Sequence, residues 1–373
     1  MKSYLNLMKY TLKHGRWVSH ERTGTRTLQV VGPQLSFNLL DGFPLVTSRY
    51  VPFKNAISEI LWFLSGSTDE RVLRQQKNPV WSLWALTEKD VKSASSHSDP
   101  YGNDLYVGSC GPIYGEQWRR WPKHDGTTID QIQYVMDTLK TNPTSRRLVV
   151  SAWNPEYLPD ETLSPQANII RGKQALAPCH TLFQLVTQKA SIMERYRWMT
   201  TNMPFQQHVA LDSIVRSSGK SFLNQCRILT GHFGIGSLFS MSDDQFSEFD
   251  TQRLHVMFDQ LRVPSRILHM KMFARSQDLP LGTVFNIASY ALLLTIMAKH
   301  SDMIAGTYHH TMTDVHIYEN QIELAREHIK RPTFPLPVLE IKEGVPTIFD
   351  YKVDDFTLVH YEHGDYIKYP ITK

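Results

Sequence analysis

The sequence has few cysteines, little excess charge and no long apolar run. Three cysteines, Cys110, Cys179 and Cys226, are too few and too irregularly spaced for a disulfide framework or a zinc site, which indicates a reducing compartment. Forty basic and 36 acidic residues give a net charge of +4, which does not predict nucleic-acid binding but allows a local basic pocket.

Membrane insertion and export are also not expected. The longest apolar stretch, FNIASYALLLTIMA, is shorter than the roughly 18 residues that a membrane-spanning helix needs. The first residues, MKSYLNLMKYTLKHG, have no apolar segment of the signal-peptide kind. We therefore expect a soluble cytoplasmic protein with no metal, no nucleic acid and no membrane among its partners.

The chain contains enough apolar residues to form a core. Its hydrophobic fraction is 41% and its charged fraction 20%, as in ordinary globular proteins. A length of 373 residues is large for one domain, but enlarged single domains reach it. We expect one domain over residues 1–373, with polar or motif-poor insertions at about 87–110, 155–174 and 189–268.

Strand and helix patterns are mixed along the chain. FKNAISEILWFLSG has the apolar spacing of one helix face and ends at Gly66, and VFNIASYALLLTIMAKH predicts a buried helix. TLQVVGPQLSFNLL predicts strands broken at Gly-Pro, and LVVSAW, ILHMKMFARSQD and HHTMTDVHIY predict further strands. A helix is also expected in TIDQIQYVMDTLK. This mixture predicts the α+β class.

For two residues, the sequence pattern alone does not decide between a structural and a catalytic role. Cys179, in ALAPCHTLFQ, is either a buried inert thiol or a reactive one, because cysteine is among the residues most often found inside proteins. Glu59 lies off the apolar stripe of its helix, and it is either a solvated surface residue or a catalytic acid facing a cleft.

A series of short motifs resembles, in order, the thymidylate synthase family, which includes hydroxymethylases of deoxypyrimidine nucleotides. The motifs cover most of the chain outside the three insertions. They are RTGT (22–25), DGFPLVT (41–47), SEILWFLSG (58–66), VWSLW (80–84), GPIYGEQWR (111–119), SRR (145–147), APCHTLFQ (177–184), ARSQD (274–278), FNIASYALL (285–293) and DVHIY (314–318).

The resemblance implies a mixed sheet packed against helices and a homodimer joined sheet to sheet. It also implies that Cys179 attacks C6 of deoxyuridylate (dUMP), which turns C5 into a nucleophile for a one-carbon unit from 5,10-methylenetetrahydrofolate. The thiolate is the reactive form, so nearby cations are needed to favour it.

The resemblance further implies which residues bind the nucleotide. Arginine forms bidentate bonds to phosphate and stays charged, which suits a phosphate site. In the implied site, Arg146 and Arg147 reach across the dimer interface. The implied substrate-binding residues are Arg22, Arg146, Arg147, His180, Arg275, Ser276, Gly282, His316 and Tyr318. His316 and Tyr318 are expected on one face of a strand, beside the deoxyribose.

The remaining implied residues serve catalysis and folate binding. Glu59 acts as general acid and base, and Tyr114 lies near the reacting ring. Asp278 contacts both the uracil and the folate, while Trp81 and Trp84 pack against the folate. The amide of Asn286 reads the uracil edge, which favours dUMP over deoxycytidylate; the alternative is that Asn286 is an ordinary helix N-cap.

Three departures from the family pattern bear on the product. The chain ends in YPITK instead of a short apolar tail, Met312-Thr313 replaces Gly-Gly, and GTVFN (282–286) replaces Leu-Pro before Phe. We expect these changes to exclude water less well from the site, so that water can add to the methylene group on C5. We therefore expect 5-hydroxymethyl-dUMP as product, a reaction that suits a virus modifying its DNA. Thymidylate is the alternative product, and a non-catalytic nucleotide- or RNA-binding relative is the rival class.

Overall fold

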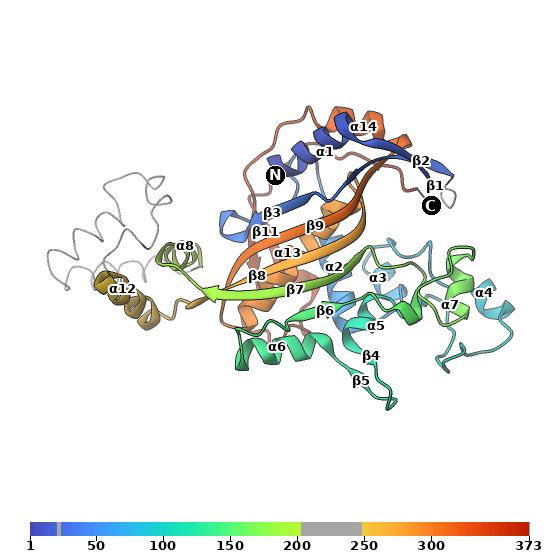
Figure 1. The fold of residues 1–373 in the computed structure, drawn as a ribbon, viewed down its shortest axis with the longest axis horizontal. Helices are drawn as coiled ribbons and strands as arrows, with labels where there is room; N and C mark the ends of the chain where they lie inside the picture. The colour runs from blue at the N-terminus through green and yellow to red at the C-terminus, as the bar shows by residue number, and fades with distance from the viewer. Residues whose placement is uncertain (21–23, 203–247, 373) are drawn as a thin grey trace.

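A mixed β-sheet forms the centre of the computed structural model, which describes residues 1–20, 24–202 and 248–372 (Figure 1). Within these residues the sheet has seven strands in the order β1-β2-β9-β8-β7-β6, with β3 also paired to β9. Strands β8 and β9 are parallel and the other pairs are antiparallel. The strands are β1 (Arg16–His20), β2 (Thr25–Val31), β3 (Gln34–Asn38), β6 (Val149–Ser151), β7 (His180–Lys189), β8 (Arg266–Asp278) and β9 (Ile304–Tyr318). The expected α+β class and mixed sheet are confirmed.

The parallel pair is connected through the buried helix α13 (Gly282–His300). Parallel neighbours need such a crossover, whereas antiparallel neighbours do not. Helix α13 is long and apolar enough to cross a membrane by composition, but 72% of its most apolar window is buried inside the protein. It is therefore the central core helix, as its sequence predicts.

Helix α2 (Phe53–Ser65) packs against α13 behind the sheet. It ends where predicted, at Gly66, whose φ of 74° is in the left-handed region that glycine adopts without strain. Two guanidinium groups then bind the end of the helix: Arg120 donates to the Gly66 carbonyl over 2.6 Å, and Arg119 donates to the Leu64 carbonyl. These contacts fix the direction in which the chain leaves α2.

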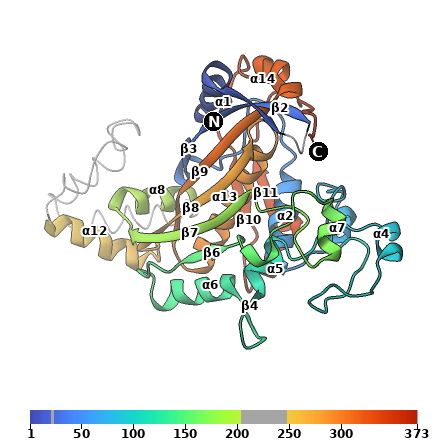
Figure 2. The same ribbon diagram turned by 45° about the vertical axis from the view of Figure 1, so that its right-hand side comes forward.

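The remaining helices surround this centre (Figures 1 and 2). Helices α1 and α14 pack together beside β2 and β9, and α6 packs against β6. Two small hairpins, β4–β5 and β10–β11, complete the fold. The bounds are α1 (Lys2–His14), α3 (Arg71–Gln75), α4 (Glu88–Ser93), α5 (Tyr114–Arg119), β4 (Trp121–Pro122), β5 (Thr128–Ile129), α6 (Gln131–Thr141), α7 (Pro165–Ile170), α14 (Ile322–His328), β10 (Val338–Ile341) and β11 (Phe356–Val359).

In the described part of the chain, one face of the sheet has no helix over most of its area, and Figure 1 looks onto it. Alternate residues of β7 show the two faces: Phe183 and Leu185 are buried against the helices, while Val186 is 50% exposed. Val149 of β6 is also exposed on the sheet surface. Exposed apolar side chains on a flat sheet face are typical of a surface that another protein covers.

The connection between β7 and β8 contains α8 (Ile192–Asn202) and α12 (Glu248–Gln260). Arg195 of α8 is buried and pairs with Asp259 of α12, Nη2 to Oδ1, over 2.5 Å. Trp198 packs against Ala190 and Ile267 at the edge of the sheet. The described residues of the motif-poor segment 189–268 thus include helices α8 and α12, and its last residues already belong to β8, which begins at Arg266.

The other two expected loops also contain short helices. Helix α4 lies within 87–110 and begins with a capping box between Thr87 and Asp90. Helix α7 lies within 155–174, and the side chain of Ser164 caps its first turn. Both start signals were present in the sequence but stood among polar residues without an apolar stripe.

Candidate active site

Cys179 lies directly before β7, with its side chain exposed. Its backbone is fixed from both sides: the Cys179 N–H donates to Tyr114 Oη over 2.8 Å, and the Cys179 carbonyl accepts from the Arg275 N–H over 2.6 Å. The alternative of a buried inert thiol is therefore wrong for Cys179. It describes Cys110 instead, which is fully buried, and burial raises the pKa of that thiol. Cys226 lies outside the described residues.

Aromatic rings support the cysteine from behind. Tyr114 stacks on His180 with ring centroids 4.1 Å apart and planes at 15°. His180 Nδ1 lies 2.7 Å from Tyr290 Oη. Burial lowers the pKa of His180 to about 3, and it raises the pKa values of Tyr114 and Tyr290 well above 10. All three rings are therefore uncharged at neutral pH and hold the start of β7 in place. His180 is buried, so it supports the site from behind instead of facing open space.

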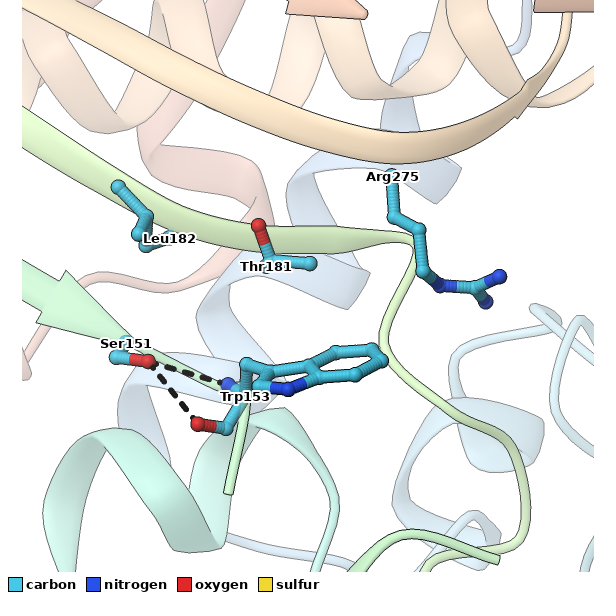
Figure 3. Close-up of a pocket in the computed structure, with 5 residues that line it drawn as sticks. All are labelled: Ser151, Trp153, Thr181, Leu182 and Arg275. Atoms are coloured by element: carbon cyan, nitrogen blue, oxygen red, sulfur yellow. Dashed lines mark hydrogen bonds between the residues drawn. The ribbon is translucent and has the colours of Figure 1, made fainter. Parts of the chain in front are cut away.

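A cation lies beside the segment that carries the cysteine. The exposed Arg275 guanidinium donates to the carbonyls of Ala177 and Pro178, over 3.4 and 3.3 Å. It also lies 5.8 Å from the ring centroid of Trp153. These residues border an open pocket of ≈ 400 Å³ on the uncovered sheet face (Figure 3). The pocket is lined by Ser151, Trp153, Thr181, Leu182 and Arg275.

Glu59 of α2 is not a solvated surface residue. It is partly buried, and its Oε1 accepts a hydrogen bond from Trp81 Nε1 over 2.8 Å. Burial raises the pKa of Glu59 to about 7, and the bond from Trp81 offsets part of that rise. A carboxyl group with a pKa near neutrality can both give and accept a proton, as a general acid and base must.

Trp81 and Trp84 line the same region. Their ring centroids are 5.9 Å apart at 70°, and Trp81 also packs edge-on against Tyr114 at 6.0 Å. Trp81 is 7% exposed, while Trp84 is partly exposed. A series of three contacts, Glu59 to Trp81, Trp81 to Tyr114 and Tyr114 to the Cys179 backbone, therefore connects the predicted acid to the predicted nucleophile.

A second group of predicted residues gathers where β8 and β9 end. Ser276 Oγ donates to Asp314 Oδ2 over 2.9 Å, and His316 Nδ1 lies 3.3 Å from Asp314 Oδ1. Burial alone would raise the pKa of Asp314, but bonds from His316, Gln29 and Ser276 hold it below its ordinary value. The His316 and Tyr318 rings are 5.0 Å apart, so they share one face as predicted.

Asp278 closes β8 directly beside this group. Its Oδ1 accepts from the Leu281 N–H over 3.0 Å, and its Oδ2 accepts from Gln321 Nε2 over 2.9 Å. Burial raises the pKa of Asp278 above its ordinary value, and the two hydrogen bonds offset only part of that rise. Gly282 follows at the start of α13, where a Cβ would meet nothing nearer than Asp278 Cβ at 3.9 Å. The backbone there is open to close approach by a ligand.

Asn286 lies in the second turn of α13, whose N-cap is Leu281, so the N-cap alternative is wrong. Its Nδ2 donates to Gln277 Oε1 over 3.2 Å. This bond orients the amide, because Gln277 Oε1 only accepts. The second N–H of the Asn286 amide can donate to a ligand, and its carbonyl can accept. Uracil has the matching groups, because O4 accepts and N3–H donates.

The structure does not bring Arg146 and Arg147 to Cys179 of the same chain. Both are exposed and precede β6, whose Val149 pairs with Gln184 of β7. Gln184 is four residues beyond His180, about 13 Å at the rise of an extended strand. Arg22 lies outside the described residues.

Sequence reasoning missed two buried residues that position the site. Tyr290 is four residues after Asn286, so it lies on the same face of α13, and this spacing was a usable signal. Gln321, which binds Asp278, follows the DVHIY motif by three residues, and nothing in its local pattern marks it.

Of the residues that depart from the family pattern, Thr313 and Ile371 are exposed and three others are buried. Thr283, Val284 and Met312 are each at most 1% exposed. Thr283 Oγ1 donates to the Asp278 carbonyl over 3.1 Å. These side chains therefore belong to the core beneath the site and do not form a wall that would admit water.

Comparison with known proteins agrees with this arrangement. The family model described as Thymidylate synthase matches residues 2–212 and 246–373. A thymidylate synthase of Francisella philomiragia is 34% identical, with all of both chains covered. One of Listeria innocua is 33% identical, also over all of both chains, and one of Pseudomonas fluorescens is 33% identical over 99% of this chain and 98% of its own.

An exposed cysteine, a carboxyl group with a pKa near 7 and a tryptophan pair define an enzyme suited to covalent attack on a ring substrate. The chain belongs to the thymidylate synthase family. This family transfers a one-carbon unit to dUMP and takes it from 5,10-methylenetetrahydrofolate as co-substrate. The relatives named here are bacterial thymidylate synthases, so the comparisons favour the methyl-forming alternative over the expected hydroxymethylase and give no support to phage DNA modification.

Proposed function

We propose that the protein converts dUMP to thymidylate by reductive methylation. The observation that carries this proposal is the continuous set of contacts from Glu59 through Trp81 and Tyr114 to the backbone of the exposed Cys179. A protein that only bound nucleotides would need neither an exposed nucleophile nor a carboxyl group with a pKa of about 7. The rival class of a non-catalytic relative is therefore disfavoured.

In the proposed reaction, Cys179 adds to C6 of the uracil ring and Asn286 holds the ring edge. Arg275 and Ser276 bind the phosphate, and releasing Ser276 Oγ from Asp314 frees its proton for a phosphate oxygen. His316 and Tyr318 hold the deoxyribose. Glu59 exchanges protons with the ring carbonyl and with the departing amine through water. Tyr114 keeps the cysteine backbone fixed throughout.

The residues present fit a folate. Trp81 and Trp84 offer an aromatic wall, Asp278 offers a carboxylate, and Gly282 leaves its backbone open to approach. When bound, methylenetetrahydrofolate supplies the one-carbon unit and, in methyl formation, the hydride. Buried Thr283, Val284 and Met312 support a dry site, which favours the methyl product.

We further propose one catalytic domain that works as a homodimer joined through the uncovered sheet face. The exposed Val149 and Val186 on that face suit a second copy. Arg146 and Arg147 of one chain would then enter the pocket beside Arg275 of the other, and each site would need both chains.

The test is to incubate the protein with dUMP and methylenetetrahydrofolate and to identify both products. Methylated nucleotide with equimolar dihydrofolate is expected. Hydroxymethylated nucleotide with tetrahydrofolate would refute methylation and restore the hydroxymethylase. Efficient turnover of deoxycytidylate would refute the role of Asn286.

The nucleophile is tested by Cys179→Ala, which is expected to remove turnover. Cys110→Ala is the matched control, because the Cys110 thiol is fully buried and its loss is expected to leave activity within severalfold of the unchanged protein. Turnover by Cys179→Ala equal to that of Cys110→Ala would refute the assignment.

A further inference from the structure

Gln321 is a fully buried amide at the end of η4 (Glu319–Gln321), which follows β9. Its Oε1 accepts from the Tyr318 N–H over 3.1 Å. Its Nε2 donates to Asp278 Oδ2 over 2.9 Å and to the Pro370 carbonyl over 3.1 Å. A buried amide with both ends bonded has one stable orientation. Gln321 thus connects the strand end, the carboxylate and the C-terminal segment.

The C-terminal segment is fixed in the core up to Tyr369. Tyr369 is 4% exposed, its Oη lies 3.0 Å from His328 Nδ1, and the Arg49 guanidinium lies 5.4 Å from its ring centroid. After this point the contacts are fewer. Ile371 is 55% exposed, and Thr372 Oγ1 accepts a long bond of 3.5 Å from Asn320 Nδ2. The Pro370 carbonyl bond to Gln321 is therefore the main polar attachment of residues 370–372.

The same amide decides how the Asp278 carboxylate is oriented. Asp278 Oδ1 is held by the Leu281 N–H and Oδ2 by Gln321, so the carboxylate plane is fixed from two sides. Without the second bond, Asp278 would turn about its side-chain torsions. Without the Pro370 carbonyl, one N–H of Gln321 would lack its acceptor, and a buried unsatisfied donor is costly.

We propose that Gln321 is a positioning residue that couples docking of residues 370–372 to the orientation of Asp278. This inference rests on the proposed function, because it assigns Asp278 to the folate. When residues 370–372 are docked, they and Asp278 exclude water from the reacting carbon. When the segment is released, a water oxygen bonds to the methylene carbon on C5 and loses a proton to solvent, and the C6–S bond to Cys179 then breaks to restore the C5=C6 double bond. The products are hydroxymethyl-dUMP and tetrahydrofolate, because no hydride is transferred.

Two variants separate this role from simple folding. Gln321→Glu has the same shape and still accepts from the Tyr318 N–H, but in its ionised form it donates a hydrogen bond to neither Asp278 nor the Pro370 carbonyl. Gln321→Met removes all three bonds. Asn320→Ala is the matched control, because Asn320 is exposed and, among the described residues, its side chain is bonded to the tail by the long bond to Thr372. Thermal unfolding of each variant reports its folding.

For both Gln321 variants we expect kcat to fall at least tenfold and the KM for folate to rise severalfold. The Kd for dUMP alone is expected to rise less than the KM for folate, because Arg275, Ser276 and Asn286 also hold the nucleotide. The hydroxymethylated fraction of the product is expected to increase. Asn320→Ala is expected to behave like the unchanged protein. A fall in dUMP affinity equal to the rise in folate KM would show a general disturbance of the site and overturn the proposal.

Coupling is measured by repeating the Gln321→Glu change in a chain that ends at Tyr369. If Gln321 acts with the tail, the truncated protein has already lost most of the effect, and the substitution changes kcat less than threefold further. If truncation and Gln321→Glu each lower kcat by their full factor, and the two factors multiply in the double variant, the coupling is refuted. Since the unchanged protein is assayed alongside, failure of the proposed function appears there as the absence of thymidylate, independently of the Gln321 result.

Discussion

At the residue scale, Glu59 shows that a surface-like sequence pattern can belong to a partly buried carboxyl group with a raised pKa. The residue lies off the apolar stripe of α2, which is typical of a solvated position, yet Trp81 covers it and burial raises its pKa to about 7. Trp81 comes from a segment 22 residues further along the chain. The helix pattern therefore predicts α2 correctly but contains no information about the side chain that covers Glu59.

The bond from Trp81 stabilises the charged form of Glu59, so its removal is expected to raise the pKa further. In Trp81→Phe, the limb of the kcat/KM pH profile that Glu59 sets is expected to move to higher pH by about one unit, the equivalent of one hydrogen bond. Trp62→Phe is the matched control, because Trp62 packs against Trp81 but its buried Nε1 has no hydrogen-bond partner in the described part of the chain. An equal shift in both variants would contradict the role of the bond.

Glu59 is also expected to cost stability at alkaline pH. Its pKa is higher in the folded protein, about 7, than its ordinary value of 4.5, so the folded state binds the proton more tightly. The stability gained by protonation is fully present below pH 4.5 and is lost as the pH rises towards 7. The free energy of unfolding of Glu59→Gln is therefore expected to exceed that of the unchanged protein by on the order of 2 kcal/mol at pH 8 and to differ little at pH 5, as measured by thermal unfolding at each pH. The same gain at both pH values would contradict this.

At the scale of elements, the sequence predicts the helices and strands with long, regular patterns. Helix α2 and strand β8 lie where their apolar periodicity predicts them, and α13 lies where its nearly continuous apolar run predicts a buried helix. Strand β9 includes the predicted residues 309–318 but begins earlier, at Ile304. Helices α8 and α12 were not predicted. Their positions depend on contacts such as the buried Arg195 with Asp259, two polar residues 64 apart in sequence. Such pairs have no local signature.

The end of α2 allows a test of local geometry. A Cβ at Gly66 would lie 2.9 Å from Arg120 Nη1 and 3.1 Å from Arg119 Cβ, in a left-handed conformation. Gly66→Ala is expected to destabilise the protein by about 2 kcal/mol, from backbone strain and displacement of the two arginines. Gly126→Ala is the control, since Gly126 has a φ of +76° but nothing within 4 Å. Equal losses in chemical denaturation would show that only the backbone strain matters.

At the scale of the whole molecule, the motifs predict the family, and the structure gathers most of the predicted residues around β7, β8 and β9. A single chain does not bring together all the arginines that are expected to bind the phosphate. Arg146 and Arg147 precede β6, on the far part of the sheet from Cys179. Their separation from Cys179 follows from strand register, which the spacing of motifs along the sequence does not encode. The uncovered sheet face likewise becomes visible only in the folded chain (Figure 1).

A shared site predicts complementation between inactive variants. Cys179→Ala and the double variant Arg146→Glu, Arg147→Glu are each expected to lose turnover, and a refolded mixture of the two is expected to recover part of it. Mixing Cys179→Ala with Glu59→Gln is the control. Glu59 and Cys179 are joined within one chain through Trp81 and Tyr114, so no mixed pair would contain a complete site. Failure of the first mixture to recover any activity would contradict the shared site.

In the proposed homodimer, the SRR segment lies far from Cys179 of its own chain and completes the site of the partner. A chain that borrows its partner's guanidinium groups has no complete catalytic centre when alone, so the turnover of each chain would depend on how many copies surround it. On serial dilution, the rate per milligram would fall once the assembly separates, and the substrate would slow that fall by binding both halves at once.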